Sequence, residues 1–386
     1  MFLLSSTELI LLGITLVSFI ILSLYYLVAY ARPLFSARSQ KTTEETKKVP
    51  VSIIVYAQND SENLKKHLPA LLTQDYPEYQ VVVINDGSTD DTDDTLKFFQ
   101  NEFKHLYFTY VPSYARYLSR RKLAFTLGAK AAKHDILIFT EAYCEPINDQ
   151  WLSAIMSTYT SETSIVLGYC KYGNYKGLMH KLIAYDNLLS GLRYLSSVLF
   201  HHPYTGNGRN LSYRKELFFK NKGYYKSLNL LPGDDDLFVN ETATGKNTQV
   251  TYSPNSLTEM DKIEDFRVWK GMKVSRATTQ KYYKGKTLTF YHLETTCFFL
   301  FQASAITSMI VGLSGNWMVS TIAILLYLIR FIIKANVFCR SAKMLQQCGN
   351  IQWLFLLEFI QPMFSTYIHI YRLFRGNKYY TFRLES

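Results

Sequence analysis

The chain reads Val81-Val82-Val83-Ile84-Asn85-Asp86-Gly87-Ser88-Thr89-Asp90 at the point that decides its fold. The four apolar, β-branched residues predict a strand that is buried on both faces, and the acidic and hydroxyl residues after them predict a turn. Ligands of open α/β sheets bind beyond the carboxyl ends of the strands, so we expect Asp86 at a ligand-binding edge. A surface turn rich in Asp, Ser and Thr is the alternative interpretation of the same residues.

Strands and helices are predicted to alternate on both sides of this stretch. Strands are expected at 51–56, 80–84, 106–110 and 135–140, and helices at 61–73, 91–103 and 119–133. Such alternation predicts a doubly wound, mainly parallel α/β sheet. We therefore assign residues 49–290 to one α/β domain.

The composition points to a membrane protein. Hydrophobic residues make up 48% of the 386 residues and aromatic residues 15%, and they gather toward the two ends of the chain. The net charge is +11, but the central region has no basic stripe with interleaved aromatic residues, so nucleic acid is not an expected partner. The five cysteines show no C-x-x-C spacing, which favours reduced thiols facing the cytosol.

Residues 1–31 are predicted to form an N-terminal transmembrane anchor. The run 9–30 carries no charge and is long enough to cross a hydrocarbon core of about 30 Å. A basic linker follows at 32–48, and the positive-inside rule then places the next domain in the cytoplasm. The predicted localisation is the inner (cell) membrane, crossed more than once.

Residues 291–386 are predicted to form a second membrane region that flanks the sheet domain. Two helices are expected there, at about 296–313 and 317–333, separated by Ser314-Gly315-Asn316. Arg330, Lys334, Arg340 and Lys343 are expected to return the chain to the cytoplasmic side.

The stretch 351–371 is apolar enough to span but contains Glu358 and Pro362. If it crossed the membrane, the basic residues after it would lie outside, against the positive-inside rule. We therefore favour a re-entrant or interfacial helix over a span.

Five short motifs follow one another in the α/β domain. They are Pro50–Val55 with the turn at Asn59 and Asp60, Asn85-Asp86-Gly87-Ser88-Thr89-Asp90, Arg121-Lys122-Leu123-Ala124, Thr205-Gly206-Asn207-Gly208-Arg209-Asn210-Leu211-Ser212-Tyr213 and Gly233-Asp234-Asp235-Asp236-Leu237. Together they resemble the family 2 glycosyltransferases, inverting enzymes of GT-A fold that use nucleotide-sugars. Bacterial enzymes of this kind build cell-surface polysaccharides. One motif alone would be a weak signal, whereas five in order are a strong one.

The resemblance implies a role for each matched residue. Asp86 would read the nucleoside, and the substrate-binding residues would be Asn59, Asp60, Asp86, Lys122, Glu141, Arg209, Lys273 and Arg276. Asp235 is the expected catalytic base, and Asp234 is its neighbour. If the match to the family motif is shifted by one residue, Asp234 would be the base instead. Repulsion within the carboxylate run Asp234–Asp236 is expected to raise at least one pKa. An acidic helix N-cap after Gly233 is the structural alternative.

The chain departs from the family at its metal motif. It has Glu141-Ala142-Tyr143 where the family carries Asp-x-Asp, and a neutral phenol is a poor ligand for a hard divalent cation. Glu145 is near enough in the sequence to supply a replacement carboxylate, so one expectation is a site for Mg or Mn formed by Glu141 and Glu145. The other is that basic residues neutralise the diphosphate without a metal.

A second departure follows Trp269, where membrane-bound members of the family often carry Gln-x-x-Arg-Trp. The chain has Met272-Lys273-Val274-Ser275-Arg276, which keeps the basic character and loses the Gln. Lys273 and Arg276 are expected on the phosphates, and a solvated cationic helix is the alternative.

The sequence therefore predicts a membrane-bound hexosyltransferase. Its partners would be a nucleotide-sugar donor, the membrane and a lipid-linked or polysaccharide acceptor, with inversion at the transferred sugar. Because both departures weaken the match, a non-catalytic or weakened nucleotide-sugar-binding subunit of a polysaccharide assembly system is the alternative.

Overall fold

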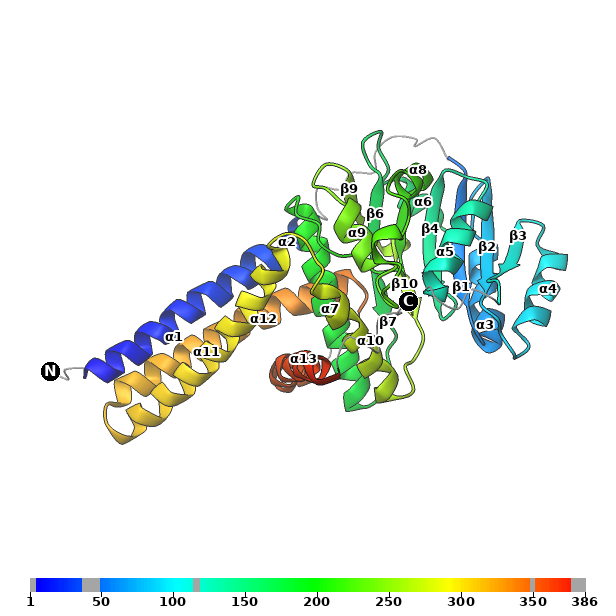
Figure 1. Ribbon diagram of the computed structural model, residues 1–386. Coiled ribbons are helices and arrows are strands. Elements are labelled where there is room, and N and C mark those ends of the chain that lie inside the picture. The colour runs from blue at the N-terminus through cyan, green and yellow to red at the C-terminus, as the bar shows by residue number, and fades with distance from the viewer. Residues whose placement is uncertain (1–4, 37–48, 114–118, 348–350, 376–386) are drawn as a thin grey trace, which may run out of the picture.

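The computed structural model describes residues 5–36, 49–113, 119–347 and 351–375. An α/β domain forms one part of the molecule, and a bundle of long helices extends from its side (Figure 1). The basic residues predicted at 38–48 and beyond 375, together with Cys348, lie outside the described residues. The thiols of the other four cysteines are free.

A seven-stranded sheet is the centre of the α/β domain. Its strand order is β3 (Leu106–Tyr110), β2 (Tyr79–Asn85), β1 (Val51–Ala57), β4 (Ile136–Glu141), β8 (Leu211–Arg214), β6 (Ile165–Gly168) and β9 (Thr248–Thr251). The strands β3, β2, β1 and β4 pair in parallel, as do β6 and β9, and only β8 is antiparallel to its neighbours. The predicted doubly wound, mainly parallel sheet is confirmed.

Helices cover both faces of the parallel half of the sheet. They are α3 (Ser61–Leu72), α4 (Thr92–Glu102), α5 (Arg120–Ala131) and α6 (Trp151–Met156). Successive strand residues point to opposite faces, so Ile53 packs with α3, α4 and α6, while Ile54 packs with α5. Both faces of these parallel strands are therefore buried from solvent, which explains the uninterrupted apolar runs in the sequence.

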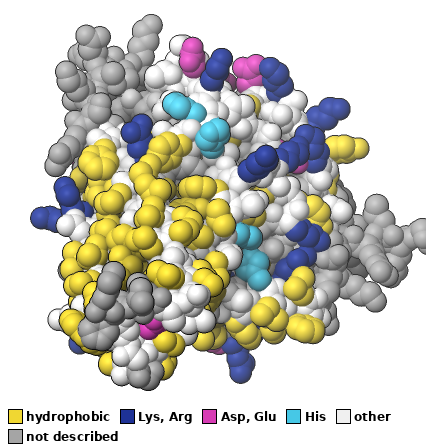
Figure 2. Space-filling model, turned by 90° about the vertical axis from the view of Figure 1, so that its left-hand side faces the viewer, with side chains coloured by type: hydrophobic (Ala, Val, Ile, Leu, Met, Phe, Trp, Pro, Cys, Tyr) yellow, Lys and Arg dark blue, Asp and Glu magenta, His cyan; other side chains and the backbone are white. Residues whose placement is uncertain are grey.

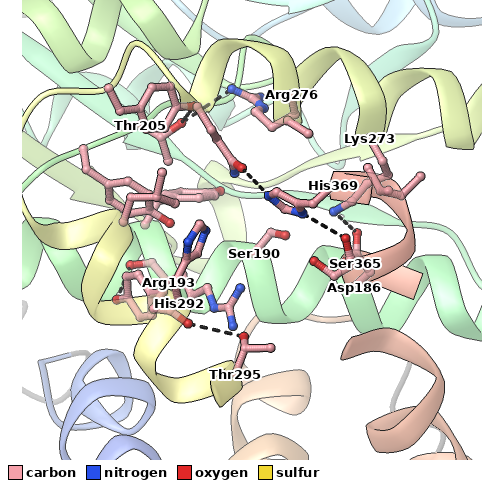
Figure 3. Close-up of a pocket in the computed structure, with 18 of the residues that line it drawn as sticks. Asp186, Ser190, Arg193, Thr205, Lys273, Arg276, His292, Thr295, Ser365 and His369 are labelled. Carbon is pink, nitrogen blue, oxygen red and sulfur yellow. Dashed lines mark hydrogen bonds and ion pairs between the residues drawn. The ribbon is translucent and has the colours of Figure 1, made fainter. Parts of the chain in front are cut away.

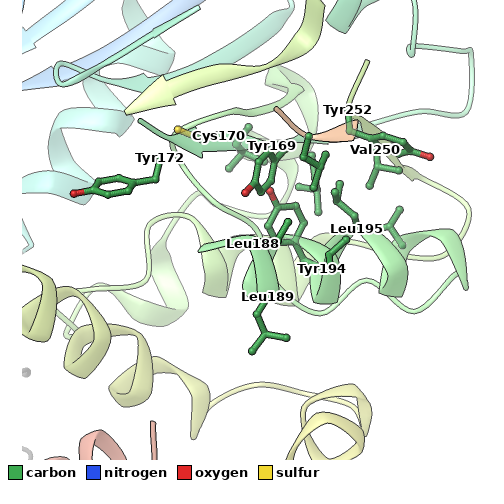
Figure 4. Close-up of a cluster of buried hydrophobic side chains, with 14 of the residues drawn as sticks. Tyr169, Cys170, Tyr172, Leu188, Leu189, Tyr194, Leu195, Val250 and Tyr252 are labelled. Atoms are coloured by element: carbon green, nitrogen blue, oxygen red, sulfur yellow. The ribbon is translucent and has the colours of Figure 1, made fainter. Parts of the chain in front are cut away.

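A smaller sheet extends the domain toward the helical bundle. It consists of β5 (Cys144–Pro146), β10 (Thr258–Met260) and β7 (Cys170–Tyr172). The helix α7 (Leu178–Leu199) packs beside it through a buried cluster in which the rings of Tyr169 and Tyr194 lie among leucines (Figure 4). The phenol of Tyr169 donates to the side-chain oxygen of Gln347, which ties this cluster to the chain near residue 347.

Three further helices and three 3₁₀ turns connect other parts of the described chain. They are α8 (Lys215–Lys220), α9 (Asp236–Thr242), α10 (Phe266–Gln280) and three 3₁₀ turns at Tyr225–Ser227, Pro254–Ser256 and Ile351–Trp353. α9 and α10 carry residues of the candidate site described below.

Three segments are long and apolar enough to cross a membrane: Ser6–Ser36, Thr287–Leu313 and Trp317–Met344. They comprise α1 (Ser6–Leu24), a π-helical turn (Tyr25–Tyr30), α2 (Arg32–Ser36), α11 (Thr287–Ser314) and α12 (Trp317–Met344). Seen from the bundle side, the molecule presents a broad hydrophobic surface with Lys and Arg along its border (Figure 2). Such a surface is compatible with membrane association.

The helix α13 (Leu354–Arg375) runs across the bundle and is seen nearly end-on in Figure 1. Met363, Tyr367, Ile370 and Phe374 are exposed at helical spacing and form one apolar stripe. A helix with one apolar face is typical of a membrane interface.

Two expected helix ends were wrong. α11 begins at Thr287 rather than near residue 296, because Glu294 inside its polar first turns is buried against Arg193. α12 continues to Met344 rather than ending at 333, because Arg330 and Lys334 are buried and pair with Glu358 of α13. These two cations therefore stabilise a helix contact and do not mark a return to water.

Candidate active site

Asp86 lies one residue beyond β2, at the carboxyl edge of the sheet, and is only 2% exposed. Its Oδ1 accepts a hydrogen bond from Arg120 Nε at 2.7 Å, and its Oδ2 accepts one from the phenol of Tyr56 at 2.7 Å. Burial and the hydrogen bond to Asp86 raise the pKa of Tyr56, so the phenol stays protonated and donates. The carboxylate is thus held in one orientation at the edge where ligands of such sheets bind.

Asn59 and Asp60 form the adjoining turn after β1. Asn59 adopts a left-handed conformation (φ 54°), and its side-chain oxygen accepts from the backbone N–H of Thr89 at 2.8 Å. Asp60 accepts from the backbone N–H of Gln58 at 2.8 Å. Both side chains therefore shape the edge around Asp86, as the sequence placed them.

Arg121 lies between two carboxylates. Its Nε is 2.9 Å from Asp234 Oδ2, its Nη1 is 3.2 Å from Glu141 Oε2, and its Nη2 contacts the other oxygen of Glu141. Burial opposes the charge of Arg121, but Asp234 and Glu141 more than offset this and raise its pKa. The guanidinium also lies over the ring of Tyr56, 5.1 Å from its centroid, which joins this group to the Asp86 edge.

The run Asp234–Asp236 starts α9 after Gly233, whose φ of +101° favours glycine. Asp235 is the N-cap residue, and its Oδ2 accepts from the backbone N–H of Gly208 at 2.9 Å and from Arg276 Nη2 at 2.9 Å. Burial alone would raise the pKa of Asp235, but Arg276 and the backbone donors outweigh it and lower that pKa. Asp235 is therefore ionised at neutral pH.

Asp236 has a different environment. It is buried, accepts from the phenol of Tyr283 at 2.7 Å and lies 3.0 Å from Arg276 Nη1. Burial raises its pKa, with Arg276 opposing and the charge of Asp235 adding to the increase. The expected rise of one pKa in the run thus falls on Asp236, and its main cause is burial rather than repulsion.

These charged groups line a pocket of about 480 Å³, which we call the carboxylate pocket. Its lining includes Arg121, Glu141, Tyr143, Asn207, Arg209, Asp234, Asp235, Asp236, Met272 and Arg276. Five residues chosen from the sequence thus line one cleft: Glu141, Arg209, Asp234, Asp235 and Arg276. Arg209 pairs with the neutral phenol of Tyr143 and not with a carboxylate of this lining, so its guanidinium would suit a ligand that carries phosphate.

Lys122 does not reach this pocket, which corrects one expected contact. Its side chain is fully buried, and its Nζ donates to the carbonyl oxygens of Ser227 at 2.6 Å and Leu230 at 3.0 Å. Burial lowers the pKa of Lys122 to about 8, against the opposing charge of Asp234. Lys122 holds the 227–230 loop in place.

Glu145 is not beside Glu141, which corrects the expected metal ligands. Its Oε2 lies 3.0 Å from Nδ1 of His67, and the carboxylate of Glu141 is engaged by Arg121. Burial raises the pKa of Tyr143, whose phenol accepts from Arg209 Nε at 3.3 Å. Among the described residues, no group of three or more His, Cys, Asp or Glu side chains is arranged to hold a metal ion.

Lys273 faces a second pocket of about 440 Å³, which we call the helix pocket (Figure 3). Lys273 and Arg276 of α10, Arg193 of α7, His292 of α11 and His369 of α13 line this pocket. Asn207 and Arg276 line both pockets, so the two are adjacent.

Three side chains that contact the site carboxylates were not among the site residues chosen from the sequence: two arginines and one tyrosine. Arg120 binds Asp86, Arg121 joins Glu141 to Asp234, and Tyr56 orients Asp86. The signal was present, because Arg120 and Arg121 stand at the start of the predicted helix 119–133, next to the Lys122 that was chosen.

The fold of the α/β domain is similar to that of GT-A glycosyltransferases. Residues 52–219 match the family model described as Glycosyl transferase family 2, which confirms the resemblance carried by the motifs. The structure is similar to the mannosyltransferase PcManGT from Pyrobaculum calidifontis in complex with GDP-Man and Mn²⁺, with a TM-score of 0.56 and 15% identity, over 88% of this chain and 98% of that one.

Two further similarities are more limited. Over 110 residues the chain is 30% identical to the glycosyltransferase AglE of Haloferax volcanii. The matched region covers 28% of this chain and 34% of AglE. The chain thus matches about a third of the length of that relative. S. aureus TarS 1–349 in complex with UDP-GlcNAc gives a TM-score of 0.42 at 16% identity, over 84% of this chain and 92% of that one.

Proposed function

We propose that this protein is a membrane-bound glycosyltransferase that moves a sugar, with inversion, from a nucleotide-sugar to a lipid-linked or polysaccharide acceptor. The observation that carries the proposal is the ionised carboxylate of Asp235 in a pocket that also holds Arg121, Arg209 and Arg276. A base and a set of cations are the two things that such a transfer requires.

The donor would bind across the sheet edge and the carboxylate pocket. Asp86 would accept from the nucleoside, with Asn59 and Asp60 shaping the turn around it. The diphosphate would lie toward Arg209, which lines the carboxylate pocket beside the uncharged phenol of Tyr143. The neighbour PcManGT, which was captured with GDP-Man, supports a nucleotide-sugar as the donor.

Asp235 would act as the base. The acceptor oxygen bonds to the anomeric carbon, the bond from that carbon to the phosphate oxygen breaks, and the nucleoside diphosphate leaves. The proton of the acceptor hydroxyl passes to Asp235, which a low pKa keeps ready at neutral pH. Attack opposite to the leaving group produces inversion.

The Mn²⁺ bound by PcManGT supports a divalent cation, Mg or Mn, in this class of fold. In this chain, Glu141 is neutralised by Arg121, and Tyr143 supplies no charge. These residues do not fit a site of two free carboxylates, so charge neutralisation of the leaving group is assigned to Arg209, whose partner Tyr143 is uncharged, and no step is routed through a metal.

The proposed location is the inner (cell) membrane, with the α/β domain in the cytoplasm. Three apolar helical segments of spanning length support the membrane assignment. Nucleotide-sugar as the donor fits a cytoplasmic domain, and basic residues at 32–48 agree with the positive-inside rule.

The test is Asp235→Asn, which keeps shape and hydrogen bonding but removes basicity. Transfer should fall by about 10²–10⁴-fold, as is typical of a lost general base, with donor binding nearly unchanged. Asp149→Asn, on an exposed side chain outside both pockets, is the matched control. If Asp234→Asn abolished transfer while Asp235→Asn did not, Asp234 would be the base.

A non-catalytic nucleotide-sugar-binding subunit is the second candidate. It is favoured by Tyr143 in the metal motif and by Lys273 in place of the expected Gln. A wild-type protein that binds nucleotide diphosphate through Asp86 but transfers no sugar from any donor in a panel would establish it.

A further inference from the structure

The helix pocket is built for an uncharged ligand, because its cations already have carboxylate partners. Arg193 Nη2 lies 2.7 Å from Glu294, Lys273 Nζ lies 2.7 Å from Asp186, and Arg276 Nη2 lies 2.9 Å from Asp235. An anionic ligand would have to break one of these pairs and leave a carboxylate uncompensated.

Neutral polar and aromatic side chains make up most of the rest of the lining. Hydroxyl, amide and phenol groups face the space from four helices and two loops, among them Ser190, Thr205, Gln280, Tyr283, Thr295 and Ser365. Among the described residues, neither Ser190 Oγ nor a ring nitrogen of His292 has a hydrogen-bond partner, and Figure 3 shows both beside this space. Such groups would match the hydroxyls of a sugar, and the aromatic rings would match its apolar faces.

The pocket also lies where a membrane lipid could reach it. Its walls include Thr296 and Phe299 of the apolar helix α11 and Ile368 of α13. Phe299 is exposed, as are Tyr367 and Ile370 on α13, the helix that contributes Ile368 to the lining. A hydrocarbon chain could therefore lie between these helices while its polar end enters the pocket.

On these grounds we propose that the helix pocket receives the uncharged saccharide end of a lipid-linked acceptor, which enters from the bilayer between α11 and α13. The inference rests on the proposed function and selects, from its two acceptor classes, the lipid-linked saccharide. Arg276 and Asn207 form the shared wall, so a hydroxyl of this saccharide would reach Asp235 from the helix pocket. That hydroxyl would lose its proton to Asp235 as its oxygen bonds to the anomeric carbon and the bond from that carbon to the leaving nucleoside diphosphate breaks.

The experiment uses the full chain in phosphatidylcholine nanodiscs and a photoreactive dodecyl maltoside, with labelled peptides mapped by mass spectrometry. We expect labelling of residues 186–194, 292–299 and 361–369. Ser190→Trp and Thr366→Trp fill the pocket from two different helices and should each lower this labelling by about tenfold or more. Thr321→Trp, an exposed hydroxyl on α12 outside the pocket, should leave it unchanged.

A photoreactive dodecyl phosphate distinguishes the headgroup chemistry. Stronger labelling of the same segments by the phosphate than by the maltoside would overturn the proposal, as would labelling that neither tryptophan variant reduces. Binding of free nucleotide diphosphate, with and without Asp86→Ala, is measured in the same nanodiscs. A wild-type protein that binds no nucleotide but is labelled by the maltoside would contradict the proposed donor and leave the acceptor site standing. A wild-type protein that binds nucleotide but is not labelled by the maltoside would contradict only the acceptor assignment.

Discussion

At the scale of single residues, the start of α5 shows how one turn of helix serves three purposes. Arg120 holds Asp86, Arg121 joins Glu141 to Asp234, and Lys122 points inward to the carbonyls of the 227–230 loop. Successive residues of an α-helix are rotated by about 100°, so three adjacent basic side chains face three directions. Two of these side chains serve the site and one serves the fold.

Lys122→Met should therefore affect stability and not nucleotide binding. The change leaves two buried carbonyls unsatisfied, which costs about 1–3 kcal/mol of the free energy of unfolding. The folded-state pKa of Lys122, about 8, lies below that of an unfolded lysine. The unfolded chain thus binds more protons between these values, and wild-type stability should rise with pH there.

Thermal unfolding from pH 7 to 10 measures both effects. The rise with pH should be smaller in Lys122→Met than in the wild type. Weaker nucleotide binding at unchanged stability would mean that Lys122 contacts the donor.

Arg276→Gln should change the pH dependence of transfer. If Asp235 is the base, as proposed, transfer requires its ionised form, and the rate then falls as the pH drops through the pKa of that group. Arg276 is the main cation that lowers this pKa against burial, so its loss should raise the pKa and move the acid limb of kcat/KM to higher pH. Lys262→Gln, an exposed residue paired with Glu264, is the control. An unmoved acid limb in Arg276→Gln would show that another group is the base.

Much of the site could be predicted from sequence, because the motifs mark which segments meet at the sheet edge. The partners of each side chain could not, since they depend on helix rotation and on contacts far along the chain. The pair Arg276–Asp235 joins residues from two motifs, and Glu145 turns toward His67 rather than Glu141.

At the scale of elements, the strands predicted from apolar runs were accurate within one or two residues, because burial on both faces leaves a continuous signal. The small sheet β5-β10-β7 was missed, since each of its strands has three residues and no periodicity to detect. Gly128 shows another feature that sequence alone does not reveal. A Cβ there would lie 2.7 Å from both Ile54 and Ile84, so the glycine permits α5 to dock closely on β1 and β2.

The contact between α12 and α13 leads to a prediction about an element. Glu358 is fully buried between Arg330 and Lys334, so Glu358→Gln leaves two buried cations without a counter-charge. Losing one partner of a buried pair costs about 3–5 kcal/mol, and α13 should detach more readily.

Limited proteolysis near α13 and thermal unfolding measure this change. Glu62→Gln, in the exposed pair with Lys65, should alter neither. Proteolysis at the wild-type rate in Glu358→Gln would show that packing alone holds α13.

At the scale of the whole molecule, the apolar bundle and the α/β domain lie at opposite ends (Figure 1). If the domain is cytoplasmic, the connection between α11 and α12 lies on the other side of the membrane. Gly315→Cys should then react with an impermeant thiol reagent on intact cells, whereas Lys104→Cys, exposed on the α/β domain, should react only after lysis. The opposite pattern would reverse the orientation.

The shared wall between the two pockets has a consequence for hydrolysis of the nucleotide-sugar when no acceptor is bound. While Arg276 is paired with Asp235, the carboxylate of Asp235 accepts hydrogen bonds from Arg276 and from the backbone N–H of Gly208. A water molecule competes poorly with these two donors for the carboxylate. An arriving acceptor hydroxyl must insert beside this guanidinium, and so its presence frees the base. We expect spontaneous breakdown of the nucleotide-sugar to be slow in an enzyme without acceptor, which makes the ion pair a safeguard that conserves activated sugar.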